Sequence, residues 1–151
     1  MESPTRFTYP AKDGTEIVGY RWDPAGRPRG VVQLTHGMGE HVQRYDALAR
    51  ALTGRGLVVY GQDHRGHGAT ARHADELGQL GPDGWTQLVG DIDLLVSRIR
   101  DEQPGLPLVL LGPVTDVGFY RLVNEAAGPN VIQLRDALPG QHHVGERTGH
   151  G

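Results

Sequence analysis

The stretch from Val31 to His41, VVQLTHGMGEH, decides the fold of this chain. A run of β-branched and aliphatic residues ends at His36-Gly37-Met38-Gly39, and residues with helical spacing follow at once. This order predicts a buried parallel strand that delivers a glycine-containing loop to the carboxyl edge of a sheet, where open α/β folds bind their ligands. Glycine beside Met38 lets the backbone approach a substrate and point peptide N–H groups at it. A tight strand-to-helix turn without chemistry explains the same residues, and the stretch alone leaves both interpretations open.

Length and composition indicate one globular domain with a real core, since the chain has 151 residues, of which 37% are hydrophobic and 22% charged. The net charge of −3 offers no electrostatic basis for binding nucleic acid or an anionic membrane. The absence of cysteine excludes disulfides, thiol catalysis and cysteine-ligated metal. Neither a signal-peptide core nor a run long enough to span a membrane is present, so we expect no stable membrane insertion and a cytoplasmic protein.

The order of predicted elements is a β-hairpin followed by β-α-β-α-β, which is typical of an α/β sheet with right-handed crossovers and helices on both faces, a three-layer sandwich. Asp13-Gly14 between two alternating segments marks the hairpin. The predicted strands are Arg6–Tyr9, Thr15–Trp22, Val31–Thr35, Leu57–Tyr60 and Leu106–Leu111, and the predicted helices are His41–Thr53 and Trp85–Arg100.

Four segments together resemble a known family. They are THGMGEH (35–41), RYDALARAL (44–52), DHRGHG (63–68) and PGLPLVLLG (104–112). In this order and spacing they are similar to the α/β-hydrolase superfamily, in particular to the monoacylglycerol lipase and lysophospholipase branch, also grouped as serine aminopeptidase-like (S33) hydrolases. The resemblance runs from about Tyr9 to Gly112. It implies that residues 1–112 form the amino-terminal part of a hydrolase sheet and that residues 113–151 are a divergent tail.

The resemblance implies a small lipid-like carboxylic ester as substrate, of the monoacylglycerol or lysophospholipid class, and no cofactor. Met38 matches the position that supplies one oxyanion-hole N–H in the family, with His36, Gly37 and Gly39 in the same loop. Gly66-His67-Gly68 matches a loop beneath the site.

The chain departs from the family after the last predicted strand. The family has a strained G-x-S-x-G turn there, and this chain reads Gly112-Pro113-Val114-Thr115-Asp116. Val114 therefore holds the nucleophile position and cannot attack a carbonyl. Family members are also longer, with a lid and later triad residues. We expect this chain to have no intact catalytic residue and to be inactive, apparently truncated.

The tail from residue 113 to 151 has helical spacing from Phe119 to Ala126 and a possible strand at Asn130–Leu134. Our hypothesis is that a frame slip, or a junction with foreign sequence, replaced the family sequence after Gly112. An apolar strand such as Leu106–Leu111, left near an edge of the sheet, also predicts self-association.

Two other chemistries have ordinary explanations. Asp116 could be a displaced aspartate nucleophile. An elbow centred on Asp116 would require glycine two residues earlier, where this chain has Val114, and a role as helix N-cap explains Asp116. The pairs His64/His67 and His36/His41 invite a zinc hypothesis, yet they lie in glycine loops where the resemblance makes His36 and His67 structural, so we expect no metal site. Two function classes stay open: an ester hydrolase by descent, or a non-catalytic remnant or interaction domain.

Overall fold

A five-stranded mixed sheet forms the centre of the protein, whose computed structural model describes residues 3–112. The strands run in the order β1-β2-β4-β3-β5, with β3 parallel to both β4 and β5, and β2 antiparallel to β1 and β4. Their bounds are β1 Thr5–Pro10, β2 Glu16–Trp22, β3 Gly30–Leu34, β4 Leu57–Gln62 and β5 Leu108–Leu111.

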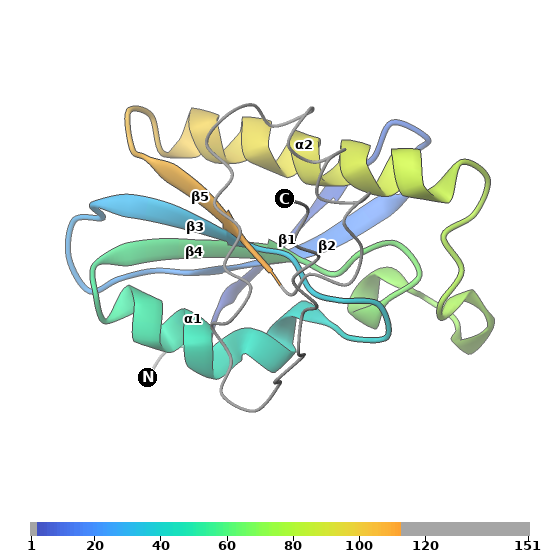
Figure 1. Cartoon of the computed structure of the whole chain (residues 1–151), viewed down its shortest axis with the longest axis horizontal. Coiled ribbons are helices and arrows are strands. Elements are labelled where there is room, and N and C mark those ends of the chain that lie inside the picture. The colour runs from blue at the N-terminus through green and yellow to red at the C-terminus, as the bar shows by residue number, and fades with distance from the viewer. Residues whose placement is uncertain (1–2, 113–151) are drawn as a thin grey trace, which may run out of the picture.

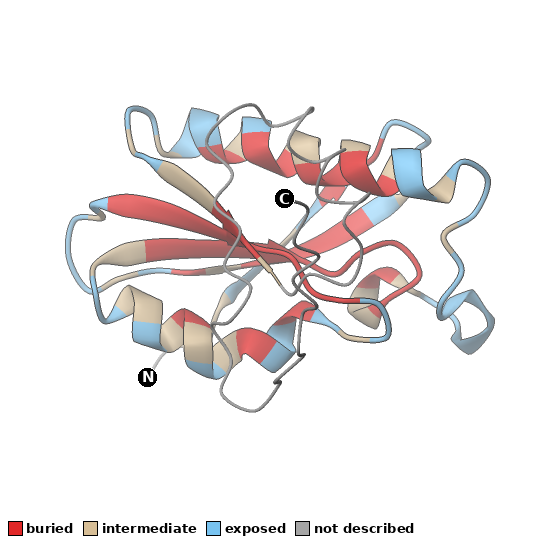
Figure 2. Ribbon diagram, viewed as in Figure 1, coloured by how far each residue is buried: buried red, intermediate tan, exposed pale blue. Residues whose placement is uncertain are grey.

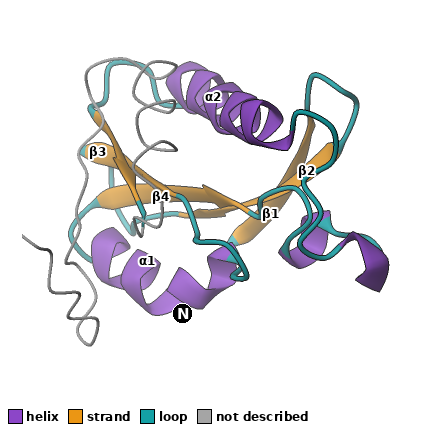
Figure 3. Ribbon diagram, turned by 45° about the vertical axis from the view of Figure 1, so that its right-hand side comes forward, coloured by secondary structure: helices purple, strands orange, loops and turns teal. Residues whose placement is uncertain are grey.

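Helices cover both faces of this sheet. The helix α1 (Asp46–Thr53) lies on one face and the long helix α2 (Gly84–Glu102) on the other, as Figures 1 and 3 show. Three short 3₁₀ turns, η1 (Val42–Tyr45), η2 (Gly68–Thr70) and η3 (Ala74–Glu76), lie in the connections. The predicted α/β class with three layers is therefore confirmed.

The core follows from the two-residue period of the strands, which points successive side chains to opposite faces. On β3, Val32 and Leu34 pack in one cluster with Ala49 of α1, whereas Val31 packs in a second with Leu95 and Ile99 of α2. Figure 2 shows these buried positions concentrated in the central strands and on the inner sides of both helices. Every residue of β3 is buried, as the aliphatic run predicts for a central parallel strand.

Most element boundaries differ from the predictions by one or more residues, and three of the differences are informative. The helix predicted over His41–Thr53 begins with the 3₁₀ turn η1 and becomes α-helical only at Asp46. Strand β4 continues two residues past Tyr60 because its end also pairs with β2, with Gly19 opposite Gln62. Strand β5 begins at Leu108 rather than Leu106, directly after Pro107, which has no N–H to donate to a ladder.

Candidate active-site loop

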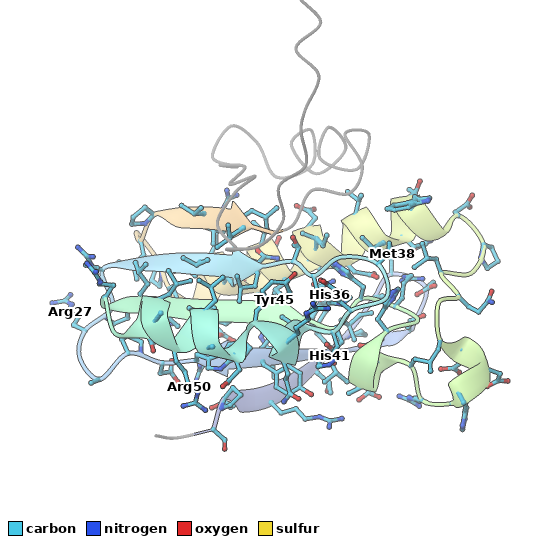
Figure 4. All side chains as sticks on the ribbon, turned by 60° about the horizontal axis from the view of Figure 1, so that its bottom comes forward. Arg27, His36, Met38, His41, Tyr45 and Arg50 are labelled. Carbon is cyan, nitrogen blue, oxygen red and sulfur yellow. The ribbon has the colours of Figure 1, made fainter. Side chains whose placement is uncertain are left out.

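The loop that follows β3 lies at the carboxyl edge of the sheet. Since β3 and β4 are parallel, the loops after both strands emerge at the same end of the molecule, where α2 also begins (Figure 1). His36 lies where β3 enters the loop, and Met38 lies farther out (Figure 4). The side chain of Met38 is among the exposed large apolar groups of the described residues, with 42% of its surface accessible.

Three of the four N–H groups from Gly37 to Glu40 donate hydrogen bonds to other groups of the protein. The Gly37 N–H donates to Glu40 Oε2 at 2.8 Å and the Glu40 N–H to the Gly37 carbonyl at 3.2 Å. The Gly39 N–H donates to His67 Nε2 at 3.1 Å. For the Met38 N–H, no acceptor is found within residues 3–112. The loop therefore presents one available backbone donor, at the position where the resemblance expects one.

The carboxylate of Glu40 fixes the conformation of this loop. Besides the Gly37 N–H, its carboxylate accepts the Tyr45 hydroxyl at 2.7 Å and lies 3.3 Å from Arg44 Nη1. Partial burial by itself raises the pKa of Glu40, but the Tyr45 hydroxyl, the Gly37 N–H and Arg44 outweigh this effect and lower the pKa below its ordinary value. Glu40 is thus a carboxylate at neutral pH, and the Gly37 N–H stays engaged.

Three buried histidines join the loop after β3 to the loop after β4. The ring centroid of His36 lies 4.1 Å from that of His64 and 5.2 Å from that of His67. His36 Nε2 accepts the His64 N–H at 2.8 Å, and His64 Nε2 lies 3.0 Å from the His36 carbonyl, to which it donates. These reciprocal bonds fix the base of the loop.

Burial also sets the charge of this cluster. It lowers the pKa of His36, and it lowers the pKa of the fully buried His64 well below the ordinary histidine value. The neighbouring histidines add to both effects. These two rings are therefore neutral at physiological pH, in agreement with a hydrogen-bond pattern that gives each ring one donor and one acceptor nitrogen.

Asp63, the residue directly before His64, fixes the start of η1 and the turn η2. Its Oδ1 accepts the Val42 N–H at 2.8 Å and its Oδ2 accepts the Ala69 N–H at 2.9 Å. Gly68 packs so closely on the Asp63 carboxylate that a Cβ atom there would collide with it. This contact explains why glycine stands at position 68.

A family model described as serine aminopeptidase, S33, matches residues 26–113, which include the whole loop and both strands that carry it. The chain belongs to this family. It is 38% identical over 114 residues to a monoacylglycerol lipase of Mycolicibacterium smegmatis, a match that covers 74% of this chain and 39% of that protein. It is 36% identical over 100 residues to the monoglyceride lipase of Homo sapiens, covering 66% of this chain and 31% of the relative. The chain thus spans about a third of the length of these relatives.

Solved structures agree with the family assignment. A thermostable carboxyl esterase from Bacillus coagulans superimposes with a TM-score of 0.77 at 26% identity, over 88% of this chain and 44% of the esterase. A structure described as a lipase in its open form gives a TM-score of 0.76 at 28% identity, over 85% of this chain and 42% of the lipase. This S33 chain therefore has the α/β-hydrolase fold.

A buried ion pair supports the loop after β4 in this S33 chain. Arg65 makes two contacts with Asp91 of α2, Nε to Oδ2 at 2.8 Å and Nη2 to Oδ1 at 2.9 Å. It also binds Asp13 in the hairpin turn, with Nη1 to Oδ2 at 2.8 Å. Burial raises the pKa of Asp91, an effect that Arg65 opposes, and the hydrogen bond from Arg65 holds the pKa of Asp13 well below its ordinary range.

His36, Gly37, Met38 and Gly39 all lie in the loop after β3. His41 is exposed and does not join the histidine cluster. No group of three or more potential metal-ligating side chains is found among residues 3–112. In the same part of the chain, no helix is long and apolar enough to cross a membrane.

Val114 and Asp116 lie outside the described residues, so their assigned positions remain predictions. The sequence analysis did not single out three buried polar residues that support the loops after β3 and β4, namely Asp63, Arg65 and Asp91. Asp63 and Arg65 belong to the DHRGHG motif, which was available as a signal, whereas Asp91 reads as one charge on an amphipathic helix.

Proposed function

We propose that this chain retains the oxyanion-loop half of a monoacylglycerol-lipase-like site and does not itself hydrolyse esters. The sequence after β5 carries this proposal, because Gly112 is followed by Pro113 and Val114 where the family requires a serine on a strained turn. Without a nucleophile, only residual acceleration from binding and oxyanion stabilisation is left.

No other serine replaces the missing nucleophile in this sequence, which contains only Ser3 and Ser97. Ser3 precedes β1 and is exposed. Ser97 is exposed on α2, well beyond the middle of a helix that begins at Gly84, and at about 1.5 Å per residue it lies roughly 20 Å along the axis from that end. Neither hydroxyl stands at the carboxyl edge of the sheet beside Met38.

The loop after β3 remains suited to bind the carbonyl oxygen of a small lipid-like ester. Its Met38 N–H has no acceptor among the described residues, and the neighbouring Gly37 and Gly39 N–H groups are held in place by Glu40 and His67. An oxyanion donor of this kind contributes about 3 kcal/mol to the transition state in working hydrolases. The substrate class proposed is that of the relatives named monoacylglycerol and monoglyceride lipase.

Activity-based labelling tests this proposal directly. The purified chain is incubated with a fluorophosphonate probe and with short p-nitrophenyl esters, beside an active serine hydrolase and an albumin blank. We expect no labelling and no turnover above the blank. Stoichiometric labelling that maps to a single residue would show that a nucleophile exists and would overturn the proposal.

The end of the family match supports a hypothesis for the origin of the sequence after β5. The match stops at residue 113, one residue past the glycine that follows β5. A frame slip or a junction with foreign sequence after Gly112 accounts for this abrupt stop. The coding DNA decides the matter: an alternative frame that encodes Gly-His-Ser-Met near this point supports the origin, and a locus without such a frame rejects it.

A further inference from the structure

Each histidine of the buried cluster uses both ring nitrogens, in patterns that only neutral tautomers satisfy. His36 donates from Nδ1 to the Gly37 carbonyl at 2.8 Å and accepts at Nε2, from the His64 N–H. His67 donates from Nδ1 to the Arg65 carbonyl at 3.0 Å and accepts at Nε2, from the Gly39 N–H. His64 donates from Nε2 to the His36 carbonyl and faces the Gln62 amide nitrogen with Nδ1 at 3.5 Å.

These bonds connect two segments that are distant in the sequence. His36, Gly37 and Gly39 belong to the loop after β3, whereas His64, Arg65 and His67 belong to the loop after β4. Each hydrogen bond found between the segment 36–39 and the segment 63–67 has an imidazole as donor or acceptor. The imidazole rings therefore provide the hydrogen bonds that connect the Met38 segment to the loop after β4.

We propose that the cluster of His36, His64 and His67 forms a proton-sensitive latch, which holds the loop Gly37–His41 against the loop after β4 and releases it when His36 or His64 becomes protonated. A proton added to an imidazole turns its acceptor nitrogen into a donor. At His36 the new N–H would point at the backbone N–H of His64, so a hydrogen bond is replaced by the contact of two donors. The ring spacings of 4.1 and 5.2 Å also place like charges close together.

Charged groups around the cluster modulate the latch without replacing it. Glu40 on the loop and Asp63 after β4 favour a positive charge on His36, and His67 opposes it. Arg65 is directed away, since its guanidinium is bound to Asp91 of α2 and Asp13 of the hairpin. From β1, Tyr9 reaches the cluster only through the neutral side chain of Gln62.

Burial outweighs the two carboxylates, since desolvation is the largest effect on both His36 and His64 and lowers the pKa of each. The closed loop therefore resists protonation, and the proton is taken up by the open form. This inference concerns the loop conformation and holds whether or not the chain hydrolyses esters.

Amide hydrogen exchange measured by mass spectrometry tests the latch on the full chain. Peptides covering residues 35–42 are compared with peptides from the β1–β2 hairpin and from α2 between about pH 7.5 and pH 5.5, with correction for the intrinsic pH dependence of exchange. We expect the opening constant of the loop to rise by up to about tenfold per pH unit for each proton taken up. The hairpin and α2 stay better protected than the loop at each pH, because they exchange only through larger openings of the fold.

A matched pair of variants assigns the effect to the cluster. In His36→Gln an amide oxygen takes the place of the Nε2 atom that accepts the His64 N–H, and it does not titrate, so we expect the pH dependence of loop opening to fall by about one proton, tenfold per pH unit. His73→Gln replaces an exposed histidine outside the cluster and leaves the pH dependence unchanged. An unaltered pH dependence in His36→Gln, or a loss in His73→Gln, contradicts the proposal.

The unsubstituted chain provides an independent check by NMR of the imidazole nitrogens. We expect protons on Nδ1 of His36 and His67 and on Nε2 of His64 near neutral pH, and protonation of His36 and His64 together with loop opening. The latch is rejected if the rings become charged while loop protection is unchanged, if loop protection is constant over the whole range, or if the loop is as well protected as the hairpin and α2 at every pH and so opens only with the whole fold.

Discussion

Replacement of Arg65 by methionine tests how much the buried ion pair between Arg65 and Asp91 stabilises the fold. The substitution keeps an unbranched apolar stem and removes four contacts, two to Asp91 at 2.8 and 2.9 Å and two to Asp13 at 2.8 and 3.3 Å. The side chains of Arg65 and Asp91 are only 5% and 1% exposed, so the remaining carboxylate would be buried without a counter-ion. Removal of one partner of such a pair costs about 3–5 kcal/mol, a large part of the roughly 5–15 kcal/mol that stabilise a typical domain.

The pH dependence of this loss has a definite sign. Burial already raises the pKa of Asp91, and without Arg65 nothing opposes that effect, so the folded variant binds a proton more readily than the unfolded chain. The destabilisation is therefore greatest above the folded pKa of Asp91, and it decreases as the pH falls and the carboxyl group is neutralised.

Urea unfolding followed by circular dichroism measures these free energies, for the parent and the variant at about pH 8 and pH 5. Arg44→Met is the matched control, because the Arg44 side chain is 63% exposed and its pair with Glu40 contributes at most about 1 kcal/mol. The single variant Asp91→Leu and the double variant Arg65→Met/Asp91→Leu complete the comparison. In the double variant both charges are gone, so we expect it to lose less free energy of unfolding than the two single variants added together. A loss below about 1 kcal/mol in Arg65→Met, a loss independent of pH, or strict additivity would refute this reasoning.

Three further outcomes are expected. Val114→Ser alone should give no ester turnover in a p-nitrophenyl ester assay, because the hydroxyl gains neither a histidine base nor the glycine framework of the elbow, and clear turnover would contradict this account. The chain should form dimers or larger species in size-exclusion chromatography with light scattering, since β5 is the edge of the described sheet and is wholly apolar; a monodisperse monomer with one sharp melting transition would rule this out. Stability should decrease on acidification, by up to about 1.4 kcal/mol per pH unit for each of His36 and His64, because burial lowers both folded pKa values and the unfolded chain takes up protons first. This stability is complete above about pH 6.5 and is lost as the pH falls toward the folded values, and urea midpoints that do not change between pH 7.5 and 5.5 would contradict it.

Local patterns in the sequence were sufficient for the elements and their faces. The aliphatic run from Val31 to Leu34 predicts a central buried strand, and the apolar stripe on Trp85–Arg100 predicts the helix that covers one face. Alternation and helical spacing are properties of neighbouring residues, so they are read directly from the chain. The loop around Met38 was predictable for the same reason, since its glycines directly follow a strand.

The partners of the polar groups were decided only by the tertiary structure. Nothing local to Arg65 indicates that it binds Asp91 on α2 and Asp13 in the hairpin, 26 and 52 residues away. The tautomers of His36, His64 and His67 likewise follow from backbone groups that meet only when β3 and β4 lie side by side. Periodicity specifies which face of an element is buried, whereas hydrogen bonds between elements require their spatial order, because a buried polar group must be matched by whichever donor or acceptor the packed sheet brings within reach.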